Sequence, residues 1–187
     1  MKKLALALAV TSFVAGTASA DIRTGYYVGA GVGANSTNYG DSIGRHGMEG
    51  TVYGGYGFVT GCTYLGGELG YTFTGAKAVT RIATSERRNV FNAALLIGQK
   101  FTPSTMIYAR LGLNYAQFKI DDKITGENES KRKFSFAPGI GLETAATKNI
   151  RVRLQYVYDL GTKFDAAGFK DVKGKTQAVT LGAAWLF

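Results

Sequence analysis

The segment Thr176-Gln177-Ala178-Val179-Thr180-Leu181-Gly182-Ala183-Ala184-Trp185-Leu186-Phe187, at the end of the sequence, decides the fold. Successive side chains of an extended strand point to opposite faces, so one face carries Val179, Leu181, Ala183, Trp185 and Phe187. The other face carries the small or polar residues Thr180, Gly182 and Ala184. Aromatic rings favour the boundary between a membrane and water, whereas a soluble protein gains little from an exposed Trp-Leu-Phe end. The segment therefore predicts a strand that faces lipid and ends at the membrane interface.

The N-terminus predicts export from the cytoplasm. Lys2 and Lys3 precede the apolar stretch 4–15, and Ala18-Ser19-Ala20 provides a small-residue cleavage site before Asp21. A membrane-spanning helix needs about 20 apolar residues, so the stretch is too short for one. We expect residues 1–20 to be a signal peptide and residues 21–187 to form one β-barrel domain, with no helical anchor.

Composition narrows the function classes further. Glycine accounts for 26 of 187 residues and aromatic residues for 12%, while overall hydrophobicity is moderate. In strands with one apolar and one polar face, the hydropathy of the two faces averages to a moderate value, so a barrel can span a membrane without a strongly hydrophobic sequence. Cys62 is the single cysteine, which excludes an intramolecular disulfide and a cysteine-based zinc site. No metal or cofactor site is expected.

Eight segments have strand length and, in several, a clear period of two. They are 26–35, 48–59, 63–74, 89–101, 106–119, 133–144, 150–160 and 176–187. In segment 106–119, for example, Leu111 and Leu113 share one face while Arg110 and Gly112 share the other. Segment 89–101 is ambiguous, because residues 95–97 are consecutively apolar. Pro138 lies on the bulky face of segment 133–144, where we expect a bulge at Pro138-Gly139 to accommodate it.

The connections alternate between short and long. The short ones are 60–62, 102–105 and 145–149, and the long ones are 36–47, 75–88, 120–132 and 161–175. An even strand number with this alternation is typical of outer-membrane barrels and places both termini in the periplasm. A soluble eight-stranded barrel would also alternate, but its apolar face would point inward. Here the bulky face fits lipid and the small, charged face fits a narrow lumen. The prediction is an all-β, eight-stranded, antiparallel up-and-down transmembrane barrel.

The chain resembles the small outer-membrane β-barrel proteins of Gram-negative bacteria, such as OmpA-type transmembrane domains, OmpX and Opa-type proteins. The resemblance covers residues 22–187 and is carried by segments 25–33, 65–71, 138–143, 151–156 and 180–187. It implies a C-terminal assembly signal at Trp185 and Phe187, read by the barrel assembly machinery after transit with periplasmic chaperones. It also implies outer-membrane lipid and lipopolysaccharide as partners. The family includes adhesins and structural anchors, so the resemblance is specific for fold and weak for function.

Charged residues on the small face predict an ion-pair network in the lumen. They are Glu68, Lys100, Arg110, Glu143, Arg151, Arg153 and Asp159. An arginine facing lipid near the midplane would cost about 2–4 kcal/mol, and an unpaired charge inside would also be costly. Pairing is therefore expected, with Glu68 and Arg110 at similar height. The network would either plug the barrel or gate a narrow pore.

Most of the net positive charge lies in the long connections. Segment 75–88 carries Lys77, Arg81, Arg87 and Arg88 against Glu86, and the later two long connections add smaller excesses. Export makes nucleic acid a poor partner. Lipopolysaccharide phosphates or acidic host polysaccharides fit this charge, although solvated loops without a ligand explain it equally well.

Two motifs have simpler structural explanations. The glycines of 29–34 match a dinucleotide-binding fingerprint in letters, but no helix follows them, so no cofactor is expected. His46 lies near Ser42 and Glu49, and some outer-membrane barrels are lipid-modifying enzymes that use such residues. A glycine-flanked loop offers a triad little rigidity. We expect a monomeric, non-enzymatic barrel with a structural or surface-interaction role, with a porin-like narrow channel as the alternative and a lipid-modifying enzyme as the second.

Overall fold

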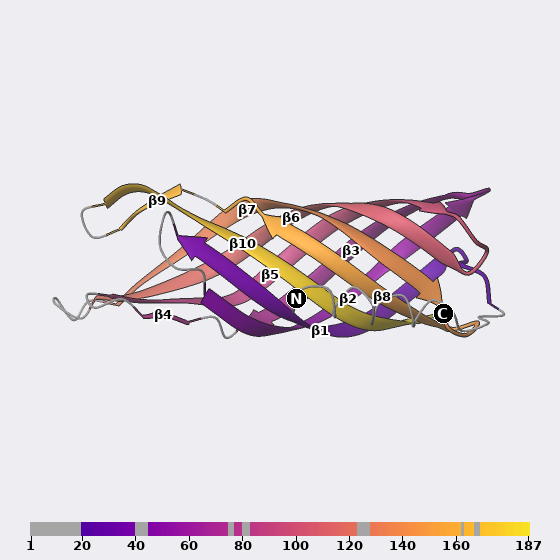
Figure 1. The fold of residues 1–187 in the computed structure, drawn as a ribbon, viewed down its shortest axis with the longest axis horizontal. Coiled ribbons are helices and arrows are strands. Elements are labelled where there is room, and N and C mark those ends of the chain that lie inside the picture. Colours follow the sequence, from indigo (N-terminus) through magenta and orange to yellow (C-terminus); the bar gives the residue numbers. More distant parts are fainter. Residues whose placement is uncertain are drawn as a thin grey trace, which may run out of the picture.

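The computed structural model describes residues 20–39, 45–74, 77–79, 83–122, 128–161, 163–166 and 169–187 as an antiparallel β-barrel (Figure 1). The expected signal peptide lies outside these residues except for Ala20. Eight strands build the wall: β1 (Gly25–Tyr39), β2 (Arg45–Thr60), β3 (Thr63–Thr74), β5 (Ala83–Lys100), β6 (Thr105–Asp122), β7 (Asn128–Ala145), β8 (Ile150–Asp159) and β10 (Phe169–Leu186). Two short strands, β4 (Lys77–Val79) and β9 (Lys163–Ala166), pair with β5 and β10. The predicted fold class is confirmed.

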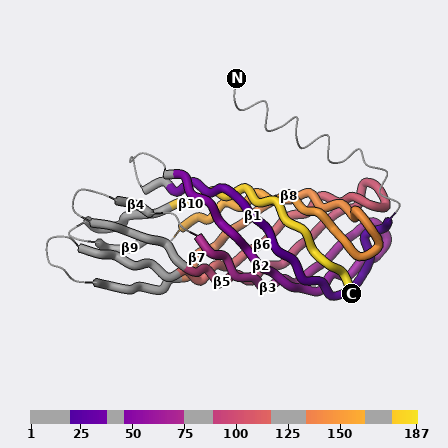
Figure 2. The backbone as a smooth tube through the Cα atoms, turned by 90° about the horizontal axis from the view of Figure 1, so that it is seen from below, coloured from indigo at the N-terminus to yellow at the C-terminus, as the bar shows by residue number. Residues whose placement is uncertain are grey.

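The sheet closes on itself. Each wall strand pairs with the next one along the chain, and β1 pairs with β10 from Tyr27↔Leu186 to Tyr39↔Gly174. Closure leaves no open sheet edge, so the backbone polar groups of the wall find partners between strands. Figure 2 shows the strands crossing the barrel axis at a steep tilt. No helix long and apolar enough to cross a membrane occurs in the described part of the chain.

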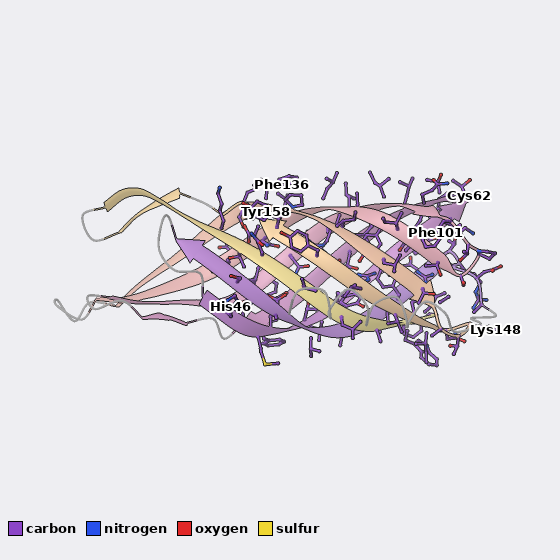
Figure 3. The ribbon with its side chains drawn as sticks, viewed as in Figure 1. His46, Cys62, Phe101, Phe136, Lys148 and Tyr158 are labelled. Atoms are coloured by element: carbon purple, nitrogen blue, oxygen red, sulfur yellow. The ribbon has the colours of Figure 1, made fainter. Side chains whose placement is uncertain are left out.

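Three tight connections lie at one end of the barrel, here called the short-turn end. Gly61 and Cys62 form the two-residue turn between β2 and β3, and Gly61 has a φ of 57°, which glycine adopts without strain. Residues 101–104 join β5 to β6, and residues 146–149 join β7 to β8. Figure 3 shows Cys62, Phe101 and Lys148 from these turns at the same end, and His46 toward the other. The C-terminus lies at the short-turn end as well (Figure 1).

The two faces of the wall are divided as the alternation predicts. Bulky side chains cover the outside, with Leu69 70% exposed, Leu111 44% and Trp185 50%. Arg110 and Arg153, which adjoin outward residues in sequence, are each 4% exposed and lie inside. An exterior of this kind would aggregate in water but suits hydrocarbon. The apolar face is therefore the outer one.

Several strands are longer than the sequence pattern indicates. β5, β6, β7 and β10 each have 18 residues, and β1 has 15. The predicted long loops at 36–47, 75–88, 120–132 and 161–175 were wrong in extent, because paired strands occupy much of them. Beyond the membrane a strand needs no apolar face, so hydrophobic alternation no longer marks it while backbone pairing continues.

One local prediction on strand geometry is wrong, and one irregularity of the wall was not predicted. The expected bulge at Pro138 is absent, because the β6–β7 register runs through Leu111↔Pro138 without a shift. The β7–β8 ladder starts at Gly139, and Leu160 N–H donates to Phe136 O beyond the proline, so a missing ladder bond accommodates the ring. A register shift lies instead in β5 between Arg88 and Val90, where Asn89 has a φ of 45°. Asparagine tolerates this conformation better than most residues.

Candidate functional site

Four charged side chains meet in the lumen toward the short-turn end. Glu143 on β7 accepts hydrogen bonds from Arg153 Nε at 2.9 Å, Arg153 Nη2 at 2.7 Å and Arg151 Nη1 at 3.2 Å. Arg153 Nη1 also donates to Glu68 Oε2 on β3 at 2.5 Å. Antiparallel pairing places Glu143 opposite Arg153, which explains their contact. The four residues form one branched ion-pair chain, in which every side chain is at most 5% exposed.

The ion-pair chain balances its own charge, because two guanidinium groups meet two carboxylates. Burying such groups is costly, and the cost is offset only when each charge has partners in good geometry. Glu143 satisfies this condition by bonding both arginines, and Glu68 bonds the far side of Arg153. The arrangement therefore ties β3, β7 and β8 together across the lumen.

Tyrosine rings surround Arg153. Its Cζ atom lies 4.5 Å from the Tyr53 ring centroid, 5.4 Å from that of Tyr108 and 5.6 Å from that of Tyr27. Tyr27 also donates its hydroxyl to Glu68 Oε2 at 3.1 Å. A desolvated cation over an aromatic face gains about 2 kcal/mol. We call this assembly the packed layer: Tyr27, Tyr53, Glu68, Tyr108, Glu143, Arg151 and Arg153.

Glycines make room for these rings. A Cβ atom at Gly29 would lie 2.6 Å from the Tyr53 ring, and one at Gly55 would lie 2.8 Å from the Tyr27 hydroxyl. A Cβ atom at Gly141 would overlap the Tyr108 ring. Each tyrosine thus packs against the backbone of a neighbouring strand at a position without a side chain. Gly29 acts here as packing space for the Tyr53 ring, and the glycine-rich stretch 29–34 continues as strand to Tyr39 instead of opening a helix.

The N-terminal segment closes the barrel below the packed layer. Ile22 is 1% exposed and packs in a cluster with Tyr64, Leu96 and Met106. Its N–H donates to Pro103 O at 3.0 Å, and Arg151 Nη2 donates to Arg23 O at 2.5 Å. Leu96, from the ambiguous run 95–97, is the member of that run that points inward. Arg151 therefore connects the ion-pair chain to the chain segment that fills the mouth of the barrel.

Three of the predicted lumen residues lie outside the ion-pair chain. Arg110 donates to Asn92 Oδ1 at 3.1 Å and to Ala137 O at 3.3 Å, so Glu68 bonds Arg153 rather than Arg110. Asp159 accepts a hydrogen bond from Asn114 Nδ2 and one from Gly161 N, both at 2.9 Å. Lys100 is half-buried near the short turns.

A polar cavity lies beyond the packed layer, toward the end of the barrel opposite the short turns, here called the long-loop end. We call it the vestibule, and its volume is ≈ 70 Å³. Hydroxyl, amide and charged groups line it, including those of Asn35, Glu49, Asn92, Arg110, Asn114 and Asp159. Glu49 accepts hydrogen bonds from Asn35 Nδ2 at 2.9 Å and from Thr180 Oγ1 at 3.1 Å. Glu68 and Arg153 of the packed layer form part of its lining.

Sequence reasoning missed several residues of this site. Tyr27 and Tyr53 were not assigned to the lumen, although each shares the parity of neighbouring inward glycines. Ile22 was not assigned to the lumen either, because it precedes the first strand and no periodicity covers it. The signal that could have found the tyrosines is the pairing of inward aromatic positions with glycine on adjacent strands.

The histidine does not form a triad with its acidic neighbour. His46 is exposed and has the outward parity of Met48, whereas Glu49 lies inside with Asn35 and Thr180. Adjacent parities of one strand cannot bring these side chains together. Ser42 lies outside the described residues. Within the described ranges, no group of three or more His, Cys, Asp or Glu side chains is placed to hold a metal ion.

The predicted surface and terminal residues lie at opposite ends of the barrel. Lys77 lies on β4, Arg87 and Arg88 lie on β5, and Arg81 lies outside the described residues. Trp185 pairs with Val28 and Ile150, and Phe187 N–H donates to Tyr26 O at 2.9 Å. The two aromatic side chains point outward near the short-turn end.

The family model described as "Outer membrane protein beta-barrel domain" matches residues 5–187. The chain belongs to this family. A curated relative, the 22 kDa outer membrane protein of Rhizobium leguminosarum bv. viciae, is 27% identical over 136 residues. That match covers 72% of this chain and 62% of the relative, so the chain spans less than two thirds of the relative's length. Family membership and the closed barrel place the protein in the outer membrane.

Solved structures share the fold of this outer-membrane barrel. Neisserial surface protein A superposes with a TM-score of 0.65 at 14% identity, covering 87% of this chain and 97% of that one. Ail, the attachment invasion locus protein of Yersinia pestis, gives a TM-score of 0.64 at 17% identity, covering 89% and 100%. Ail has also been solved in complex with the heparin analogue sucrose octasulfate, with a TM-score of 0.62 at 17% identity and the same coverage. These likenesses show the fold alone.

Proposed function

We propose that this outer-membrane barrel is a non-enzymatic surface protein that binds anionic saccharides at its long-loop end. The observation that carries the proposal is the length of the strands. A tilted membrane strand needs about 9–11 residues, whereas β5, β6, β7 and β10 have 18 each. Since the packed layer lies near the short turns, the excess length projects beyond the membrane at the opposite end, on the cell surface.

The projecting segments carry most of the positive charge. Without residues 1–20 the chain has 20 basic and 13 acidic residues, a net of +7. Segment 77–88 has four basic residues against one acidic, segment 119–133 has five against four, and segment 161–175 has four against two. These segments therefore contribute +6. Basic residues concentrated on a surface attract polyanions, and arginine binds phosphate or sulfate through two parallel hydrogen bonds.

Two anionic materials meet this surface in its compartment. Lipopolysaccharide phosphates surround the barrel, and acidic polysaccharides of other cells approach from outside. The complex of Ail with a heparin analogue makes a sulfated saccharide a suitable first probe. We also propose that the barrel is a monomer and that the assembly machinery and periplasmic chaperones recognise its end at Trp185 and Phe187.

The narrow channel remains the second candidate, because the vestibule is polar and could admit solutes. The packed layer and the Ile22 cluster oppose it, since they fill the lumen below the vestibule. A lipid-modifying activity has less support, because His46 and Glu49 lie on opposite faces of β2.

Binding to immobilised heparin and to lipopolysaccharide tests the proposal with the protein in proteoliposomes. Replacing Arg87 and Arg88 together by glutamine should weaken binding by roughly tenfold at low ionic strength. The reason is that each exposed ion pair between an arginine and an anionic group of the ligand contributes up to about 1 kcal/mol. Added salt should reduce the difference. The control replaces Lys100 and Lys148 at the short-turn end by glutamine, which removes the same charge. Equal losses in both variants, or salt-independent binding, would contradict the proposal.

A further inference from the structure

The segment before β1, residues 20–24, is bonded to two of the short turns. We call this segment the clasp. Ile22 N–H donates to Pro103 O in the β5–β6 turn at 3.0 Å, and Arg23 donates through Nη2 to Lys148 O in the β7–β8 turn. Because the clasp is continuous with β1, these bonds connect the first strand to turns between strands that follow much later in the chain.

The β7–β8 turn also holds the last strand. Leu186 N–H donates to Asn149 O at 2.7 Å, and the Asn149 side-chain amide donates back to Leu186 O at 2.9 Å. Asn149 adjoins Lys148, which accepts the bond from the clasp. One turn therefore binds both sides of the seam, by which we mean the ladder between β1 and β10.

The seam joins the parts of the wall that are most distant in sequence. Tyr27 pairs with Leu186 there, whereas each of the other wall ladders joins strands that are consecutive around the barrel and along the chain. The entropy cost of bringing two chain segments together grows with the length of chain between them, so non-local pairing is slow to form. We therefore expect the seam to close late in folding.

The clasp in turn needs the closed barrel. Ile22 is almost fully enclosed, and it packs against Tyr64 of β3, Leu96 of β5 and Met106 of β6. The mouth that encloses this side chain exists only after the wall has closed around it. The hydrogen bonds to the two turns depend on the same closure, because those turns must lie on either side of the mouth.

We propose that the clasp keeps the seam closed: it docks after β1 has paired with β10, and it slows their separation. A contact that forms after the transition state for folding slows unfolding and leaves the folding rate unchanged. The clasp lies at the short-turn end and does not depend on the saccharide binding proposed for the surface.

The test measures the rates of folding and unfolding in lipid vesicles after changes in urea concentration, by the fluorescence of Trp185. Trp185 is the single tryptophan and lies in the seam opposite Val28. Ile22→Ser should speed unfolding about fivefold, because serine does not fill the apolar cluster, and should leave folding unchanged. An unchanged unfolding rate, or folding slowed by the same factor, would overturn the proposal.

A disulfide across the seam distinguishes the clasp from a general source of stability. Ala30 and Ala183 are opposite, outward-facing partners in the β1–β10 ladder, so cysteines at both positions are close enough to form a bridge. Cys62→Ser removes the competing thiol. With this bridge oxidised, Ile22→Ser should no longer speed unfolding, and reduction should restore the fivefold difference. A difference that persists in the oxidised protein would contradict an action on the seam.

The matched control places the bridge elsewhere in the wall. Ala109 of β6 and Ile140 of β7 are also opposite and outward-facing, and a disulfide between cysteines at these positions should leave the effect of Ile22→Ser in place. If the control bridge also abolishes the effect, the clasp does not act on the seam.

Thr24→Val tests the proposal if Ile22→Ser does not fold. Val59 N–H, near the end of β2, donates to Thr24 Oγ1 at 2.9 Å, and valine removes this acceptor at nearly constant volume. Unfolding should become about twofold faster with folding unchanged, and the seam bridge should abolish the difference. A native unfolding rate in Thr24→Val would overturn the proposal.

Discussion

Inward-facing residues of the strands line both halves of the lumen, but they fill one half and leave a cavity in the other. In the packed layer, tyrosines lie over glycines and Glu143 holds two arginines, so side chains fill the barrel. In the vestibule, hydroxyl and amide groups such as those of Asn35 and Asn92 line a cavity instead. The pattern of small and polar residues is similar in both halves. The difference arises from where large aromatic residues face glycine across neighbouring strands.

Because of this difference, we expect the packed layer to contribute more to the stability of the barrel, and the vestibule to tolerate changes in its side chains. Desolvated charges need fixed partners, whereas charges beside a wet cavity can be satisfied by water or ions. The packed layer should therefore respond strongly to single substitutions and the vestibule weakly.

Glu143→Gln should have the largest effect, because it leaves Arg151 and Arg153 without their shared carboxylate. We expect the free energy of unfolding to fall by about 3–5 kcal/mol. Urea unfolding in lipid vesicles, followed by Trp185 fluorescence, measures it. The matched variant Glu49→Gln, in the vestibule, should lose about 1 kcal/mol or less. Equal losses in the two variants would remove the distinction between the halves.

Gly141→Ala should have an intermediate effect. The added methyl group overlaps the enclosed Tyr108 ring, which must move within a packed environment. Overpacking of this kind costs about 1–3 kcal/mol in the free energy of unfolding. Gly50→Ala is the control toward the long-loop end, since a Cβ atom there meets nothing within 4 Å. A neutral Gly141→Ala would show that Tyr108 is loosely held.

Ile22→Ser should have the smallest effect on global stability and a clear local one. The polar side chain weakens docking of the N-terminal segment against Tyr64 and Met106. Trypsin should then cleave after Arg23 about tenfold faster, because cleavage follows the population of the undocked segment. Val32→Ser, which changes an outward residue of β1, should leave the rate unchanged. Unchanged cleavage in Ile22→Ser would show that the side chain does not hold the segment in the mouth.

The wall of the barrel could be predicted from the sequence because lipid imposes a period of two on every spanning strand. Thr63–Thr74 was predicted with its bounds as they are in the structure, and the face of segment 176–187 that carries Leu181 and Trp185 points outward as expected. The strand ends beyond the membrane were missed, since no apolar face is required there. Parity also placed Glu143 and Arg153 inside.

Partners within the lumen could not be predicted in the same way. Parity says which face a side chain takes but not how strand tilt aligns distant strands across the axis, so the contact between Glu68 and Arg153 was not foreseen. The bulge at Asn89 shifts the register without a clear sequence signal. Ile22 acts outside any strand, where periodicity carries no information.

Ion conductance across a planar lipid bilayer tests the central claim most directly, namely that side chains close the short-turn half of the lumen. The native barrel, inserted at a density verified by quantitative immunoblotting, should give no steady single-channel current at either polarity. Reproducible ohmic steps from the native protein would contradict the account, because they would require an open path past Arg153 and Ile22.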